Sequence, residues 1–414
     1  MLRSLLAVLL LSASLRADEP AEVPPAPVAE SSLTLEVLVS IAESTSPNLT
    51  QSAAEVQAAR GRAHQAGLYP NPVASGGAMQ LGGRDSQYFA QLSQEIVTRH
   101  KLQLSEAAAC REVYQAEYRF VRTRFDLLTA VRQGYYSALA GQKRVDILRQ
   151  LVGVATKSQA SASRLLEAGE GTRSDSLLFQ IELEKAEVAL QNAEAVLAAA
   201  LRQLTASLGS PEMELQRVEG DLRVSLVPFA EQVVVDGYIP YNAEISVAEQ
   251  EVDRNRLLLK RAQVEPFPNI TVNAGYMRQY TAIENIAIVN LSAPLPLWNK
   301  NQGNISAATA NVTKASANVA TVRNNIARQM ADARGRYRAA DQLVLRYEEK
   351  IIPLARESVQ VIQEAFDQGQ FDFLRLLQAQ RALIESQLGY ISALETRWMT
   401  AAELAGLAQV DVFP

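Results

Sequence analysis

The chain has 414 residues, of which 21% are charged, and a formal net charge of −5. This mildly acidic balance argues against nucleic-acid binding, which needs a basic patch or stripe. Cys110 is the one cysteine, so a disulfide within the chain is excluded.

The N-terminal residues 1–17 have the features of a signal peptide. Arg3 precedes the short apolar run Leu5 to Leu11, and Ala17 stands at the expected cleavage site. The run is about half of the ~20 apolar residues that a membrane-spanning helix needs. Residues 18–32 are acidic and rich in proline, which predicts a flexible linker.

Beyond the linker, a helix is predicted from Ser46-Pro47, a cap followed by a first-turn proline, to Gly67. Leu68 to Pro72 ends it, because the residue before a proline is pushed toward extended backbone. Two strands should follow. The first covers Val73 to Leu81, and the second, Tyr88 to Glu95, alternates apolar and polar residues.

A long helix is expected from about Arg99 to Glu167, a segment without proline. At 1.5 Å per residue it would be on the order of 100 Å long. After a break at Gly169, leucines recur every seven residues, as in the seam of a coiled coil: Leu183, Leu190, Leu197 and Leu204. This part of the chain therefore predicts one long helical hairpin.

The second half repeats this order of features. A helix is predicted over Tyr241 to Val264, followed by prolines and by strands at Ile270 to Tyr276 and Ala287 to Leu291. A second seven-residue ladder ends the chain: Leu377, Ile384, Ile391 and Trp398.

The spacing between matching features is nearly constant. Leu92 and Leu291 differ by 291 − 92 = 199 positions, as do Lys101 and Lys300. Gly169 and Gly369 differ by 200. A tandem duplication is the simplest explanation. We expect repeats over 33–209 and 233–414, joined by an equatorial connection over 210–232.

The four strand segments are roughly ten residues long, which suits tilted strands crossing an outer membrane. Four strands cannot close a barrel, whose smallest usual size is about eight, and bare edges are not tolerated in lipid. At least two copies would be needed, and three would give 3 × 4 = 12 strands. Aromatic residues near the strand ends favour a membrane interface: Tyr88, Phe89, Tyr276, Tyr280 and Trp298. A soluble, half-buried sheet would alternate in the same way and stays open as an alternative.

In their order, several segments resemble the outer membrane factor family, the TolC-like proteins, and its branch paired with heavy-metal and cation efflux pumps. The resemblance covers Leu33 to Leu407 and is carried by Ala66–Pro72, Ala168-Gly169 with Asp175, Arg202–Leu204 before Leu208-Gly209, Asn301–Ile305 and Leu377–Arg381.

The resemblance implies a mainly α fold with membrane β structure. Coiled-coil hairpins would form a periplasmic barrel, and a homotrimer would share a 12-stranded outer-membrane β-barrel. It also implies a location in the outer membrane with most of the chain in the periplasm. The implied partners are outer-membrane lipid, a periplasmic adaptor and an inner-membrane transporter of the RND type.

In the family, the hairpin tips carry the periplasmic aperture. The matching candidates here are Gly169, Arg173, Asp175, Gly369, Asp372, Arg375 and Gln378. Arg375 stands near positions where the family often has an acidic residue, so we expect the charge at the constriction to come from Asp372 and Arg375, with Asp175 or Arg173. The alternative is that the acidic residues only cap helix starts, where negative charge is favoured anyway.

No phosphate-binding loop, nucleophile elbow or zinc-protease motif occurs in the sequence. His64 and His100 lack a second ligand at a useful spacing. We therefore expect no enzyme, no cofactor and no metal site, but a passive exit duct for small molecules or metal cations in a tripartite efflux system. The alternatives are a periplasmic adaptor or structural coiled-coil protein, and an outer-membrane duct for type I protein secretion.

Overall fold

The computed structural model describes residues 33–82, 85–169, 171–224, 242–280, 282, 284–368, 373–411 and 413. The expected signal peptide, the linker and part of the equatorial connection, 225–232, lie outside the described residues. So do Tyr241 and two aperture candidates, Gly369 and Asp372.

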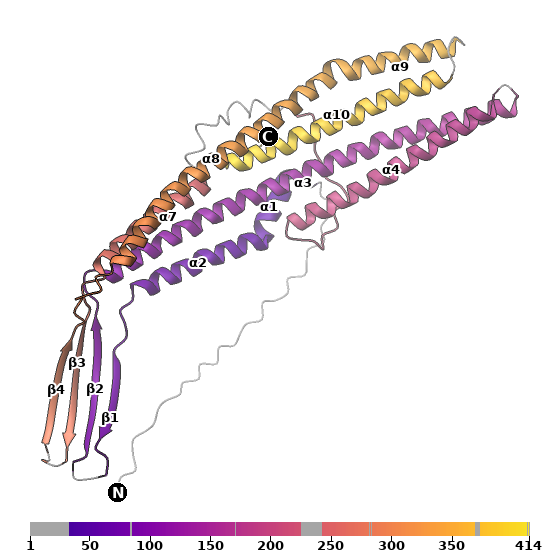
Figure 1. Cartoon of the computed structure of the whole chain (residues 1–414). Coiled ribbons are helices and arrows are strands. Elements are labelled where there is room, and N and C mark those ends of the chain that lie inside the picture. The colour runs from indigo at the N-terminus through magenta and orange to yellow at the C-terminus, as the bar shows by residue number, and fades with distance from the viewer. Residues whose placement is uncertain are drawn as a thin grey trace, which may run out of the picture. The chain divides into compact units, whose positions relative to one another are not determined.

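Both halves contain a helix, two strands and a long helical hairpin in that order (Figure 1). Within the ranges described above, the first half has one more helix before these elements, and in the second half the first long helix of the hairpin is interrupted. The first half contains α1 (Leu35–Thr45), α2 (Pro47–Gly67), β1 (Val73–Met79), β2 (Gln87–Ile96), α3 (Lys101–Glu167) and α4 (Arg173–Ser207). The second contains α7 (Ala243–Val264), β3 (Ile270–Gln279), β4 (Glu284–Ser292), α8 (Gln302–Arg346), the π-helical turn η2 (Tyr347–Ile351), α9 (Ile352–Asp367) and α10 (Phe373–Ala408).

The predicted start and end of α2 are confirmed, with Pro47 in its first turn and Gly67 as its last residue. The long helix α3 begins two residues later than the expected Arg99. Arg99 and His100 have left-handed backbones, with φ of 57° and 54°. This conformation is uncommon for residues other than glycine, and it turns the chain from β2 into α3.

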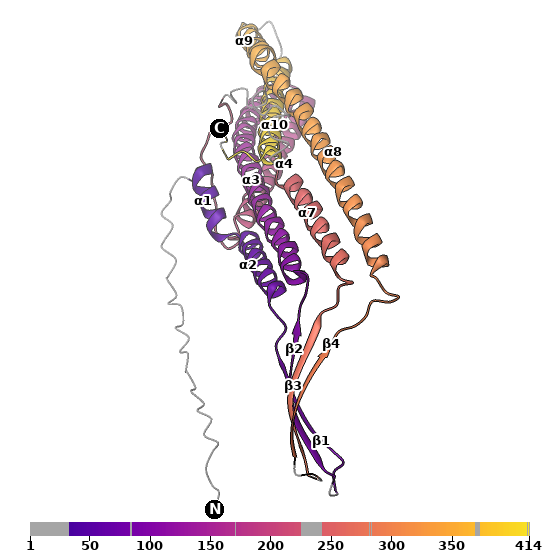
Figure 2. The same ribbon diagram turned by 90° about the vertical axis from the view of Figure 1, so that its left-hand side faces the viewer.

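The four strands form one antiparallel sheet in the order β1-β2-β3-β4 (Figure 1), and Figure 2 shows the same sheet turned by 90°. Leu92 on β2 pairs with Ala274 on β3, which in turn pairs with Val289 on β4. Side chains in such a row point to the same face of a sheet. Leu92 and Val289 are 52% and 70% exposed, so the sheet presents an uncovered apolar face. β1 ends at Met79, two residues before the expected Leu81.

Helix α3 packs against α2, α4, α7 and α10. Its glycines permit close approach on one side, since a Cβ at Gly141 would lie 3.2 Å from the Leu197 side chain of α4. The second ladder is confirmed as the buried stripe of α10, with Leu377, Ile384, Ile391 and Trp398 all buried. In the first ladder Leu204 is fully buried, while Leu183, Leu190 and Leu197 are half-buried.

The main core lies where the two halves meet. The Trp398 ring stacks on Tyr136 with centroids 4.1 Å apart and an interplanar angle of 9°. The Trp398 Nε1–H donates a hydrogen bond of 2.8 Å to the main-chain oxygen of Leu222. A buried indole N–H needs such a partner. The bond therefore fixes the connection after α4 onto α10.

A π-helical turn separates α8 from α9. Pro353 has no N–H to donate and so cannot complete the α-helical bond to the oxygen of Glu349. A wider turn at Tyr347–Ile351 precedes this proline, as is common where a helix is interrupted. Tyr390 on α10 hydrogen-bonds Glu348 within the turn. Within the described residues, no helix combines the length and hydropathy needed to cross a membrane.

Candidate functional site at the hairpin tips

The tip of the first hairpin is built by two helix caps. Gly169 has φ of 75°, and its N–H donates to the Leu166 oxygen at 3.1 Å, which ends α3. At the start of α4, the Asp175 N–H donates to Thr172 Oγ1 at 3.1 Å. The Thr172 hydroxyl donates in return to Asp175 Oδ2 at 2.7 Å. Thr172 is therefore the N-cap of α4, Asp175 is held by it through both its N–H and its carboxylate, and the exposed Arg173 lies between them in sequence.

At the second tip, α10 begins at Phe373. The candidates Arg375 and Gln378 are exposed, whereas Leu376 and Leu377 are buried. The helix thus presents its polar candidates outward and its leucines to the neighbouring helices.

The two hairpins are in contact near their tips. An apolar cluster joins Ala162 on α3, Phe179 on α4 and Leu377 on α10. Next to it, Arg381 Nη1 on α10 forms an ion pair of 3.1 Å with Glu182 Oε2 on α4. The free ends of both hairpins lie far from the sheet (Figure 1). An apolar contact and an ion pair therefore join the two hairpins near their tips.

Sequence reasoning missed this ion pair. In the sequence, Arg381 stands only as the last residue of a segment that resembles the family, and no pattern there indicates Glu182 as its partner. The presence of Arg381 in that segment is the one sequence feature that points toward this ion pair. Of the aperture candidates that the structure describes, Asp175 bonds with Thr172 at the start of its own helix, and Arg375 and Gln378 are exposed on α10.

The arrangement of side chains does not point to chemistry on a bound ligand. Within the described part of the chain, no three His, Cys, Asp or Glu side chains could together hold a metal ion. The polar tip candidates that the structure describes are exposed: Arg173, Asp175, Arg375 and Gln378. Such a surface can attract or repel ions by charge.

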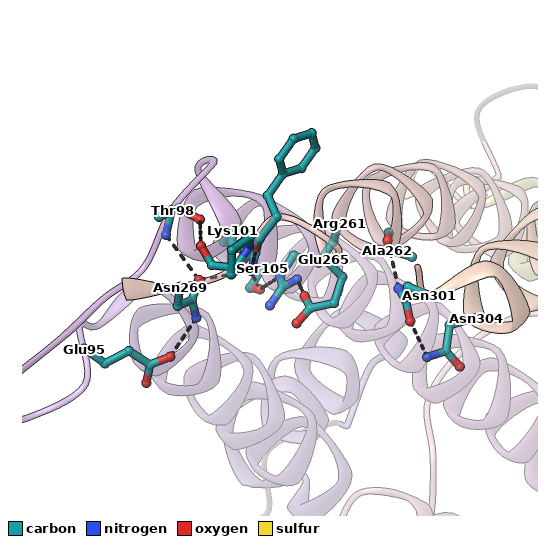
Figure 3. A network of polar contacts seen from close by, with 12 residues as sticks. Glu95, Thr98, Lys101, Ser105, Arg261, Ala262, Glu265, Asn269, Asn301 and Asn304 are labelled. Carbon is teal, nitrogen blue, oxygen red and sulfur yellow. Dashed lines mark hydrogen bonds and ion pairs between the residues drawn. The ribbon is translucent and has the colours of Figure 1, made fainter. Parts of the chain in front are cut away.

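A second polar centre joins the strands to the helices (Figure 3). Lys101, at the start of α3, is 2% exposed. Its Nζ donates to the Phe267 oxygen at 2.6 Å and to Asn269 Oδ1 at 3.0 Å. Burial lowers the pKa of Lys101, and the nearby charge of Arg261 lowers it further. The lysine therefore ties the first repeat to the segment before β3.

Further polar contacts surround this lysine. Asn269 Nδ2 donates to Glu95 Oε1 at 2.7 Å, which links the segment to β2. Arg261 forms an ion pair with Glu265. Asn301 Nδ2 donates to the Ala262 oxygen at 2.8 Å, which ties the start of α8 to α7. The result is a set of polar contacts at the level where strands become helices (Figure 3).

The chain matches the model of one protein family, described as outer membrane efflux protein, over residues 38–210 and 240–408. It is 25% identical to the cobalt-zinc-cadmium resistance protein CzcC of Cupriavidus metallidurans over 374 residues, which cover 90% of this chain and 89% of that protein. It is 26% identical to the nickel-cobalt-cadmium resistance protein NccC of Alcaligenes xylosoxydans xylosoxydans, covering 71% of this chain and 68% of the relative.

A solved structure of CusC, described in terms of folding and transmembrane channel formation, has the same fold. Its TM-score is 0.77, with 17% sequence identity, and the match covers 90% of this chain and 91% of that one.

Proposed function

The chain belongs to the outer membrane efflux protein family and is an outer-membrane channel subunit of an efflux system, and from this premise we propose that it is the passive exit duct for divalent metal cations. Most of the chain lies in the periplasm, where its long helices extend from the membrane. The adaptor alternative is not supported, because the family match includes both halves of the chain.

The single observation that carries the proposed cargo is the full-length similarity to CzcC, a cobalt-zinc-cadmium resistance protein. NccC, a nickel-cobalt-cadmium resistance protein, supports the same substrate class. A duct needs no strong metal site of its own, because tight binding would slow release. The inner-membrane transporter would then select the cation and supply the energy.

We propose three copies, a periplasmic adaptor and an RND-type transporter as the assembly. A lone sheet of four strands leaves the edges of β1 and β4 without a neighbour among the described residues. Bare edges and an uncovered apolar face are unfavourable in isolation. Three copies would supply 3 × 4 = 12 strands, the number that the family resemblance implies for a closed barrel.

We further propose that the hairpin tips are the periplasmic aperture. Of the candidates, Arg173, Asp175, Arg375 and Gln378 would place charge and polarity around the opening, with Gly169 allowing the turn. Gly369 and Asp372 stay part of this proposal from the sequence alone. The Arg381–Glu182 pair, 3.1 Å long, would hold neighbouring hairpins together in the closed state.

Deletion of the gene in its own host tests the proposed cargo. The deletion strain should become sensitive to cobalt, zinc, cadmium or nickel, and plasmid-borne wild-type protein should restore tolerance. The control is a panel of organic drugs and detergents, for which tolerance should not change. Sensitivity to the drugs alone, with unchanged metal tolerance, would overturn the cation proposal and leave the channel assignment intact.

A further inference from the structure

The tandem duplication inferred from the sequence allows the burial of each residue to be compared with the burial of its counterpart in the other repeat. Residues of α2 correspond to α7 at an offset of 196, so that Val56 corresponds to Val252, and both are buried. Residues of α3 correspond to α8 at an offset of 199, so that Ala116 corresponds to Ala315, again both buried. The same side of each helix therefore packs in both repeats.

Not every α3 position follows this pattern, and two polar residues of α3 are among the exceptions. Lys101 and Gln115 are 2% and 4% exposed, whereas their counterparts at 101 + 199 = 300 and 115 + 199 = 314, Lys300 and Lys314, are exposed. The two α3 residues are covered because α7 and the segment after it lie against α3. Nothing within the described residues lies in that place against α8.

The carboxylate opposite Gln115 also has a counterpart. Glu251 on α7 accepts from Gln115 Nε2 at 2.8 Å, from Arg254 at 3.2 Å and from Asn255 at 2.8 Å. Its counterpart at 251 − 196 = 55 is Glu55 on α2, which is exposed.

The partners of Glu251 are not reproduced around Glu55. Ala58 and Ala59 stand where Arg254 and Asn255 would be. Among the residues that the structure describes, Glu55 has no cationic partner and Lys314 has no anionic one. Within the chain, Gln115 on α3 and Glu251 on α7 bond to each other. Their counterparts, Lys314 on α8 and Glu55 on α2, carry opposite charges and are each left without such a partner among the described residues.

We infer that Lys314 of one copy pairs with Glu55 of the next copy, and that Lys300 of the first donates to main-chain oxygens of the Pro70–Pro72 segment in the second. The second contact is based on that of Lys101, which donates to the Phe267 oxygen within the chain. The counterpart of Phe267 is Asn71, since 267 − 196 = 71. The inference rests on the proposed closed assembly and adds the residues that direct it.

Such a contact is head-to-tail, with α8 and β4 of one copy against α2 and β1 of the next, and in the proposed closed assembly its repetition forms a ring. The proposed contact between copies also differs chemically from the corresponding contact within the chain. Within the chain the pair is a neutral amide and a carboxylate, Gln115 and Glu251. Between copies it is an ion pair, which is weakened by salt. Assembly should therefore depend on ionic strength more than the fold of one copy does.

Charge reversal tests the pair in the full-length protein in its membrane. Glu55→Lys and Lys314→Glu should each lower the fraction of oligomer by about fivefold or more, since each replaces attraction by repulsion. The double variant should restore assembly. Glu36→Lys, an exposed reversal on α1, serves as the matched control and should assemble normally. Failure of the double variant to recover would overturn the inference.

Cross-linking separates this inference from the proposed assembly. In a Cys110→Ala background, Glu55→Cys with Lys314→Cys should give oligomeric bands on denaturing gels after treatment with a short bis-maleimide. Gln115→Cys with Glu251→Cys should link within one chain and keep the monomer mass. If amine cross-linkers trap oligomers but the 55–314 pair gives none, the pairing is wrong and the assembly stands. If no cross-linker traps an oligomer, both are wrong.

Discussion

Arg381 on α10 and Glu182 on α4 form an ion pair 3.1 Å long, although 199 residues separate them in sequence. Glu182 also accepts from Lys185 at 2.9 Å within α4. The pair bridges the two hairpins near their tips, so any motion that separates the tips must break it.

Removal of this bridge should loosen the closed state. Arg381→Ala should raise the current through closed channels in planar lipid bilayers, because it removes an ion pair that joins the two hairpins. The matched control is Arg149→Ala. Arg149 pairs with Glu194 at 2.9 Å, but inside the first hairpin. Equal currents from the two variants would show that the inter-hairpin pair has no part in closure.

Two variants test separately the contacts of Asp175 at the start of α4 and its proposed role at the aperture. Thr172→Ala removes the capping bond from the N–H of residue 175 and should destabilise the start of α4 by about 1 kcal/mol. Asp175→Ala keeps that backbone bond and loses only the side-chain contact with Thr172. Only Asp175→Ala also removes a negative charge, and it should reduce cation selectivity in bilayer recordings. Selectivity that is identical in Thr172→Ala, Asp175→Ala and the wild type would limit Asp175 to its contacts at the start of α4.

Arg375 should control the charge of the second tip. Arg375→Glu should shift the reversal potential of the channel toward greater cation preference, since the change is repeated in every copy around the opening. Arg202→Glu, an exposed reversal elsewhere on α4, should leave the reversal potential unchanged. An unaltered potential in Arg375→Glu would remove this residue from the aperture.

Lys101 should control the rigidity of the strand–helix junction. Lys101→Met removes hydrogen bonds to Phe267 and Asn269, which we expect to cost about 2 kcal/mol because the donor is charged. The Thr98 amide, which donates to Asn269 Oδ1 at 3.3 Å, should then exchange faster in hydrogen-exchange mass spectrometry. Lys260→Met, an exposed change on α7, is the control, and equal exchange in both variants would count against a joint at Lys101.

Local and periodic features were predictable from the sequence. Pro47 and Gly67 mark the limits of α2 because proline and glycine act through their own backbone geometry. The ladder from Leu377 to Trp398 is buried because a seven-residue apolar repeat needs a packing partner. Alternation also predicted all four strands, with small errors at their ends.

Contacts between distant segments were not predictable. The Lys101–Asn269 bond joins residues 168 positions apart, and nothing near Lys101 in sequence indicates its partner. The left-handed backbone at Arg99 and His100 also carries no signal, since neither residue is a glycine. The equal spacing of Lys101 and Lys300 was the one sequence feature that pointed to the junction.

Single-channel recording tests the central claim most directly. The purified full-length protein, reconstituted into planar lipid bilayers, should produce discrete steps of ionic current. A control preparation of the same lipid and detergent without protein should produce none. Protein that is inserted in the bilayer, as shown by its resistance to carbonate extraction from matched vesicles, but conducts no ions at any applied voltage would contradict its assignment as an outer-membrane channel.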